Sequence, residues 1–125
     1  MMTIIEAINR TDNLNHNVYS QEQKIQWLSD LDGKVKRDVM DTHEGAQDLV
    51  FQGYTNGTPL HTVLLVPMPY DCLYLHWLSA QIALANGEYD KYNASITLFN
   101  DEYTAFTGDY HRSHMPKKQG KRFLF

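Results

Sequence analysis

The sequence predicts a mainly α-helical domain that resembles a four-helix bundle, because apolar residues recur at steps of three and four along several segments. The clearest of these segments runs from Glu88 to Tyr110, which corresponds to a helix of about 34 Å. Its bulky residues fall on one stripe: Tyr89, Tyr92, Ile96, Phe99, Tyr103, Phe106 and Tyr110. Aromatic rings bury large apolar areas, so we expect this stripe to dominate the core.

The segment before this stripe predicts the buried centre of the bundle. Eleven of the fourteen residues from Cys72 to Ala85 are apolar, and they occupy nearly every helical face. Asn86-Gly87 then leaves so short a link that the last two helices must run antiparallel. We therefore expect a central helical hairpin with a core seam made of Trp77, Tyr89, Tyr92, Ile96, Phe99, Tyr103 and Phe106.

Two further helices are predicted ahead of this hairpin by their capping residues. Thr3 with Glu6 has the spacing of a capping box, so a short helix opens near residue 4 and fades near Asn15. Ser20 with Gln23 repeats the pattern at the start of a second helix. That helix carries apolar residues at helical spacing: Ile25, Leu28, Leu31, Val35 and Val39.

A small β-hairpin is expected at about residues 49–66, between the second and third helices. Asn56-Gly57 is a strong hairpin turn signal, and apolar residues lie on both sides of it. Pro59 favours an edge ribbon, and the alternative is an irregular loop of about twenty residues. Pro69 suits the first position of the third helix.

Charge divides the chain into a helical domain, residues 1–111, and an extended basic tail, residues 112–125. Residues 1–110 carry six Lys or Arg against all fifteen Asp or Glu, whereas residues 111–125 carry five Lys or Arg and no acid. An acidic body with a basic tail favours contact with an acidic partner, another copy or nucleic acid. A solvated, disordered tail is the alternative.

The last helix has a second row at the same spacing as the seam: Asn93, Thr97, Asn100, Thr104 and Thr107. A solvated helix face usually carries Lys and Glu, whereas interface cores are depleted in charge. We expect this row to be a subunit interface, and an ordinary exposed face is the alternative.

Signals for catalysis, metal binding and sequence-specific DNA binding are weak. His111 and His114 are three residues apart but have only Asp109 nearby, and Cys72 with His76 lies on a helix predicted to be core. The chain contains no glycine-rich phosphate loop, zinc-protease pair or Gly-x-Ser-x-Gly turn, although carboxylates far apart in the sequence can still pair in space. We expect no enzyme activity and neither a cofactor nor a metal. One cysteine and an N-terminus that lacks a signal peptide predict synthesis in the cytoplasm, and no segment predicts a membrane span.

Five segments together resemble the head–tail connector proteins of tailed bacteriophages and prophages, also called adaptor or head-completion proteins. They are Tyr19–Lys24, Trp27–Gly33, Asp41–Gly45, Leu65–Asp71 and Ala85–Asn93. The last segment is the most specific, since a helix end of small residues, Asn-Gly and paired tyrosines recur in such proteins. The resemblance spans most of the chain and is a pattern of packing and turns.

This resemblance implies a structural protein of the virion neck, made in the cytoplasm of the bacterial host. Family members form a ring, typically of about twelve copies, beneath the portal. The ring extends the channel through which viral DNA passes without sequence-specific binding, and the next neck or tail-completion protein docks on it. The family's C-terminal segment grips the portal, and here it corresponds to Lys117, Lys118, Lys121, Arg122, Phe123, Leu124 and Phe125. Another neck or tail-completion component is the first alternative, and a small phage regulatory protein that binds DNA is the second.

Overall fold

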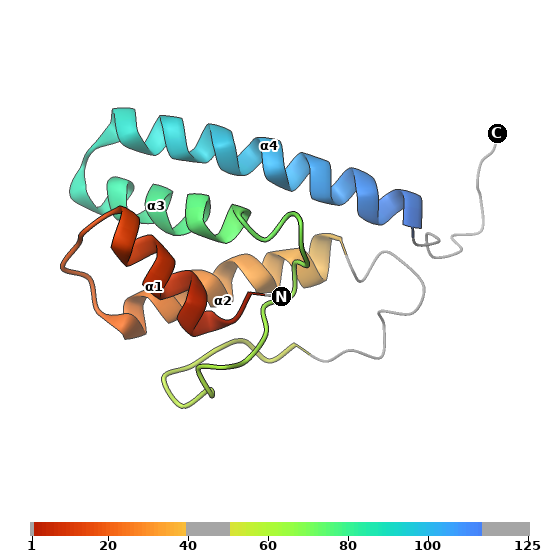
Figure 1. Cartoon of the computed structure of the whole chain (residues 1–125), viewed down its shortest axis with the longest axis horizontal. Coiled ribbons are helices and arrows are strands. Elements are labelled where there is room, and N and C mark those ends of the chain that lie inside the picture. The colour runs from red at the N-terminus through yellow and green to blue at the C-terminus, as the bar shows by residue number, and fades with distance from the viewer. Residues whose placement is uncertain (1, 40–50, 114–125) are drawn as a thin grey trace.

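The computed structural model describes residues 2–39 and 51–113, and this part of the chain is mainly helical, as predicted. It contains α1 (Ile4–Leu14), α2 (Gln21–Asp38), α3 (Leu73–Asn86) and α4 (Tyr89–Ser113). Figure 1 shows α3 in the middle, with α4 along one side of it and with α1 and α2 on the other. The α3–α4 pair makes the most extensive contact between helices, so the predicted antiparallel hairpin is present.

Both N-terminal helices begin where the capping residues predict. The Thr3 hydroxyl accepts a hydrogen bond from the Glu6 amide at 3.3 Å, and the Glu6 carboxylate accepts one from the Thr3 amide, which completes a capping box. The Ser20 hydroxyl accepts from the Gln23 amide at 3.1 Å and so caps α2.

A left-handed glycine connects α3 to α4. Gly87 has φ of 76°, a conformation that a residue with a Cβ adopts only with strain. The Gly87 amide donates to the Leu84 carbonyl at 3.1 Å, and the Glu88 amide donates to the Ala83 carbonyl at 2.9 Å. These bonds satisfy the last carbonyls of α3 and allow α4 to start two residues later.

The predicted β-hairpin is not formed in the described part of its range, residues 51–66. Asn56-Gly57 does sit in a turn, in which the Thr58 amide donates to the Thr55 carbonyl at 3.0 Å. The two sides of that turn do not pair with each other: the Tyr54 amide before it donates to Ser29 of α2, and the backbone after it bonds to the start of α1. The Ile4 and Ile5 amides of α1 donate to the carbonyls of Thr62 and Leu60, each at 3.0 Å, and one isolated bridge joins Thr3 to Val63.

The core is built mostly from aliphatic residues of α1, α2 and α3, so the expectation that the α4 stripe dominates it is wrong. Only two α4 residues, Phe99 and Phe106, belong to the buried core cluster. The other buried members from helices are Ile4, Ala7, Ile8, Ile25, Leu28, Leu31, Val35, Leu73, Tyr74, Leu75 and Leu78. Of the remaining seam residues, Trp77, Tyr92, Ile96 and Tyr103 are half-buried and Tyr89 is exposed; Tyr110, the last residue of the stripe, is also half-buried.

Two positions differ from the sequence expectation at the ends of the hairpin. Tyr89 is 65% exposed, because it begins α4 beside the turn, where α3 has already ended. Pro69 is not the first residue of α3, which starts at Leu73 after two turns in which the Tyr70 and Leu73 amides donate to the carbonyls of Pro67 and Tyr70.

Candidate functional site

The residues considered for metal binding do not come together in the described part of the chain. Residues 2–39 and 51–113 contain no group of three or more His, Cys, Asp or Glu side chains placed to hold a metal ion. Cys72 and His76 are both partly exposed, so they are not the enclosed core pair that the apolar helix suggested. The segment Asp41–Gly45 and His114 lie outside the described residues.

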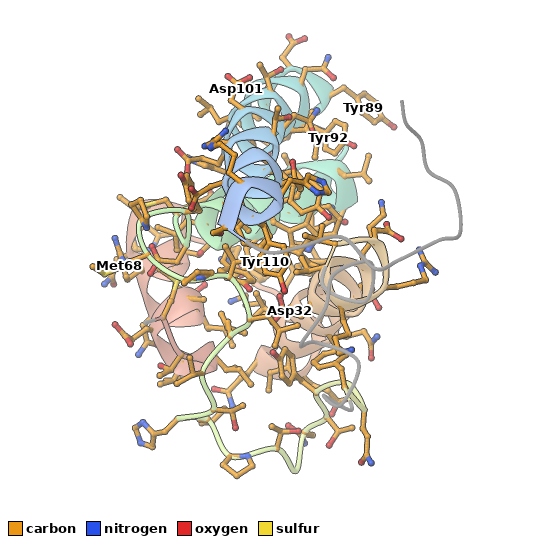
Figure 2. All side chains as sticks on the ribbon, turned by 90° about the vertical axis from the view of Figure 1, so that its right-hand side faces the viewer. Asp32, Met68, Tyr89, Tyr92, Asp101 and Tyr110 are labelled. Atoms are coloured by element: carbon orange, nitrogen blue, oxygen red, sulfur yellow. The ribbon has the colours of Figure 1, made fainter. Side chains whose placement is uncertain are left out.

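The most unusual buried group is the carboxylate of Asp32, on the inner face of α2. Asp32 is fully buried, and Figure 2 shows it inside the molecule, below the α3–α4 pair. Tyr54 donates a hydrogen bond to one carboxylate oxygen at 2.5 Å, and Tyr74 donates to the other at 2.6 Å. The Leu65 amide adds a third hydrogen bond at 3.1 Å. The carboxylate therefore joins α2, α3 and the loop from residue 51 to residue 66.

The protonation equilibria of this cluster reflect its burial. Removal from water raises the pKa of the Asp32 carboxyl, and the hydrogen bonds from Tyr54, Tyr74 and Leu65 offset part of that rise. Burial, followed by the nearby carboxylate, also raises the pKa of both tyrosine hydroxyls. The tyrosines therefore stay protonated and act as donors, which suits a structural bond better than proton transfer.

The Asp32 cluster and its neighbours hold the loop in place through further hydrogen bonds. The Val66 amide donates to the Tyr74 hydroxyl at 2.8 Å, and the Tyr54 amide donates to the Ser29 hydroxyl at 3.0 Å. Both tyrosines are buried, and Tyr54 also lines the pocket described next. Sequence reasoning missed this cluster, although an acid at the helical spacing of Leu28 and Val35 was a signal for it.

One polar pocket of about 430 Å³ lies between the first turns of α2 and the turn near residue 55. Its walls include Ser20, Gln23, Gln26, Tyr54 and Asn56, which offer hydroxyl and amide groups. The carboxylate among the lining residues is that of Glu22, and no histidine, lysine or cysteine lines the pocket with it. The Glu22 carboxylate thus has no basic side chain beside it among the lining residues.

Most of the predicted interface row belongs to the exposed surface of α4, which we call its outer face. Asn93, Thr97, Asn100 and Thr104 are exposed, and Thr107 is half-buried. Two of the threonines bond back to their own helix: Thr97 donates to the Asn93 carbonyl at 2.8 Å, and Thr107 donates to the Thr104 carbonyl at 3.0 Å. Asp101 also projects from the outer side of α4 (Figure 2). The outer face thus combines the small neutral groups of this row with the charged side chains of Asp90, Lys91, Asp101 and Arg112.

A second exposed surface lies at the turn between α1 and α2, and sequence reasoning did not single it out. Leu14 is 78% exposed and Val18 is 94% exposed. The Asn17 side chain fixes this turn, because its amide nitrogen donates to Asp12 at 3.0 Å and to the Asn15 carbonyl at 2.9 Å. Tyr19 then ties the turn to the α3–α4 connection through a 2.6 Å hydrogen bond to Asn86. Leu14 and Val18 are thus exposed to solvent on a turn that several hydrogen bonds hold in place.

The predicted portal-docking residues, Lys117, Lys118, Lys121, Arg122, Phe123, Leu124 and Phe125, lie outside the described residues. The helix before them runs to Ser113, so Arg112 belongs to α4 and not to an extended tail. The Arg112 guanidinium lies 3.7 Å from the Asp109 carboxylate, one turn earlier on the same helix.

Comparison with known proteins adds no family to these observations: no family model, no curated protein and no solved structure matches this chain. Among the described residues, no helix is both long enough and apolar enough to cross a membrane.

Proposed function

We propose that this protein is a head–tail connector of a tailed bacteriophage or prophage. It acts as a non-enzymatic structural protein of the virion neck, in which identical copies form a ring beneath the portal. The ring extends the DNA channel and presents a platform to the next neck or tail-completion protein. The resemblance of the five sequence segments to connector proteins gives this proposal its identity, and the outer face of α4 gives it structural support.

The outer face of α4 is the observation that carries the proposal. α4 has 25 residues, which is about 37 Å, and among the described helices it makes extensive contact only with α3. Its exposed surface includes Asn93, Thr97, Asn100 and Thr104, a row of neutral side chains at helical spacing. A row of neutral side chains on a long, rigid helix suits a contact with another protein, because burying charges at an interface is costly.

The basic segment after α4 supports attachment to a second protein. Residues 114–125 carry four Lys or Arg, no Asp or Glu, and the apolar run Phe123-Leu124-Phe125. Such a segment combines long-range electrostatic attraction with apolar anchors, which is a common arrangement for docking peptides. It follows directly from the end of α4, so it begins at one end of the helical body.

The test is reattachment to heads of the same phage that carry the portal but lack this protein. We expect the purified full chain to bind these heads as a ring visible by electron cryo-microscopy. A chain that ends at Ser113 should keep the folded helical body but bind at least about a hundredfold more weakly, because it lacks both the charges and the anchors.

A matched full-length variant separates the two contributions of the tail. Replacing Lys117, Lys118, Lys121 and Arg122 by Gln keeps the apolar anchors, so attachment should weaken most at low salt. Equal attachment by the full and shortened chains would remove the docking assignment. Absence of the full chain from portal-bearing heads would reject the connector function itself.

A further inference from the structure

We infer that the outer face of α4 in one copy packs against the outer face of α1 in the next copy, with Leu14 and Val18 in the contact. This inference rests on the proposed ring and deepens it by assigning the second half of each subunit interface. A closed ring with more than two identical copies uses two different surfaces on every subunit. The α4 row supplies one surface, so the other must lie elsewhere on the same body.

The position of α1 suits the second surface. α3 separates α4 from α1 and α2, so α1 and α4 expose outer faces on different sides of the body (Figure 1). One subunit can therefore contact two neighbours at once through these two helices. A contact from α4 to α4 would instead use the same face on both copies and would stop at a dimer.

Charge distinguishes α1 from α2 as the candidate. The exposed residues of α2 include five charged side chains: Glu22, Asp30, Lys34, Arg37 and Asp38. The exposed residues of α1 include only Glu6 and Arg10 as charges, and Glu6 is already engaged in the capping box. Asn9, Asn13 and Leu14 complete that face. The outer face of α1 thus matches the low charge density of the α4 row, whereas α2 carries a typical solvated face.

The anchored turn after α1 supplies the apolar part of the contact. Leu14 and Val18 are the two most exposed large apolar side chains in the described residues, at 78% and 94%. The hydrogen bonds of Asn17 and Tyr19 hold the turn rigid, so little conformational entropy is lost when these side chains are covered. Two such side chains offer roughly 300 Å² of apolar surface, whereas a stable dimer needs about 800 Å² per partner. The patch alone is therefore too small for a stable contact, and the rest of the α1 and α4 faces must supply the remaining area.

Complementary charges fix the orientation of this contact. Arg10 on α1 is exposed, and so are Asp90 and Asp101 on α4. None of these three side chains takes part in an ion pair with any described residue. Figure 2 places Asp101 on the outer side of α4. Packing α4 of one copy on α1 of the next brings an unpaired cation and an unpaired acid from different subunits to the same interface.

The experiment is disulfide cross-linking of the full chain in a Cys72→Ser background. Asn13→Cys places a thiol on the α1 face, and Thr97→Cys places one on the α4 face. A chain with both substitutions should form a ladder of dimers, trimers and larger species on oxidation. An equimolar mixture of the two single variants should form dimers only, and each single variant alone should remain uncross-linked.

A charge exchange tests the same contact without cysteines. Arg10→Glu or Asp101→Arg alone should weaken self-association by about tenfold, and the two together should recover most of it. Two cross-linking results would overturn the assignment to α1 but leave the proposed ring intact. One is dimer formation by the Thr97→Cys chain alone. The other is a ladder that forms only when the second thiol is at Asp30→Cys on α2. A chain that forms no ladder in any variant and sediments as a monomer at every concentration would count against the ring itself.

Discussion

At the scale of single residues, the burial of Asp32 is the feature that most needs explanation. A carboxylate loses hydration when it enters a protein core, and this loss is compensated only when its oxygens accept good hydrogen bonds. Asp32 accepts three, from Tyr54, Tyr74 and the Leu65 amide. These three donors come from α3 and from the loop. The lost hydration of the carboxylate is therefore compensated only when both α3 and the loop are correctly placed.

Tyr74→Phe tests this link directly. The variant removes a donor to Asp32 and leaves the Val66 amide without its acceptor, while the ring still fills the core. We expect the free energy of unfolding to fall by about 2–3 kcal/mol, as measured by urea denaturation. Tyr19→Phe is the matched control: it loses one exposed hydrogen bond to Asn86 and should cost less than about 1 kcal/mol. Equal losses in the two variants would contradict the role of the buried cluster.

Asp32→Asn should change how stability depends on pH. Burial raises the pKa of the Asp32 carboxyl in the folded state above its value in the unfolded chain. The contribution of the neutral Asp32 carboxyl to the free energy of unfolding is therefore fully present below pH about 4. It is lost as the pH rises through the folded-state pKa. Relative to the Asp32→Asn variant, the natural chain should lose about 1.4 kcal/mol of unfolding free energy for each unit by which that pKa is raised. Denaturation curves from pH about 4 to about 7 measure this, and a difference that stays constant or changes in the opposite direction would contradict it.

At the scale of helices and loops, periodicity and capping predicted where the chain is helical but not how deeply each helix is buried. Thr3, Ser20 and Gly87 act within a few residues of themselves, so their effects on helix ends are visible in the sequence. The Asn56-Gly57 turn was also local, and it is present. The strands around it are absent from residues 51–66 because the carbonyls of Thr62 and Leu60 accept hydrogen bonds from amides of α1. These bonds join segments far apart in the sequence, so no local pattern predicts them.

The α4 stripe shows the same limit. Spacing correctly places its residues on one face, yet burial depends on what lies opposite. Phe99 lies 5.2 Å from Trp77 and Phe106 lies 6.1 Å from Tyr70, measured between ring centroids, whereas Tyr89 begins α4 where α3 has ended. The Asp32 cluster and the exposed pair Leu14 and Val18 were missed for the same reason, since both depend on the packing of distant segments.

Alanine substitutions at a buried and at an exposed position of the stripe test this difference. Phe106 is 2% exposed and packs against Tyr70, Tyr103 and Tyr110, so Phe106→Ala should lower the free energy of unfolding by about 3–5 kcal/mol. Tyr89 is 65% exposed, and Tyr89→Ala should change the free energy of unfolding by no more than about 0.5 kcal/mol. Chemical denaturation of both variants at one pH measures the contrast. A large loss of unfolding free energy in the Tyr89→Ala variant would mean that another copy of the chain already covers Tyr89 in solution.

At the scale of the whole molecule, charge is divided along the chain. Residues 1–110 have a balance of −9, from six Lys or Arg and fifteen Asp or Glu, and residues 111–125 have a balance of +5. An acidic body repels the phosphate backbone, so a channel wall built from such bodies would let DNA slide past it. If the chain attracts DNA, we expect the basic segment to do so, through an electrostatic attraction that is independent of sequence.

This division predicts weak DNA binding that depends entirely on the tail. The full chain should bind two unrelated duplexes equally, as measured by fluorescence anisotropy at low salt. Residues 114–125 contribute four cations, so the logarithm of affinity should fall against the logarithm of salt concentration with a slope no steeper than about −4. A chain that ends at Ser113 should show no binding under the same conditions, because its remaining charge is strongly negative. Preference for one duplex, or binding that survives removal of the tail, would favour a regulatory DNA-binding protein over a connector, because a recognition surface on the body would then be reading the bases.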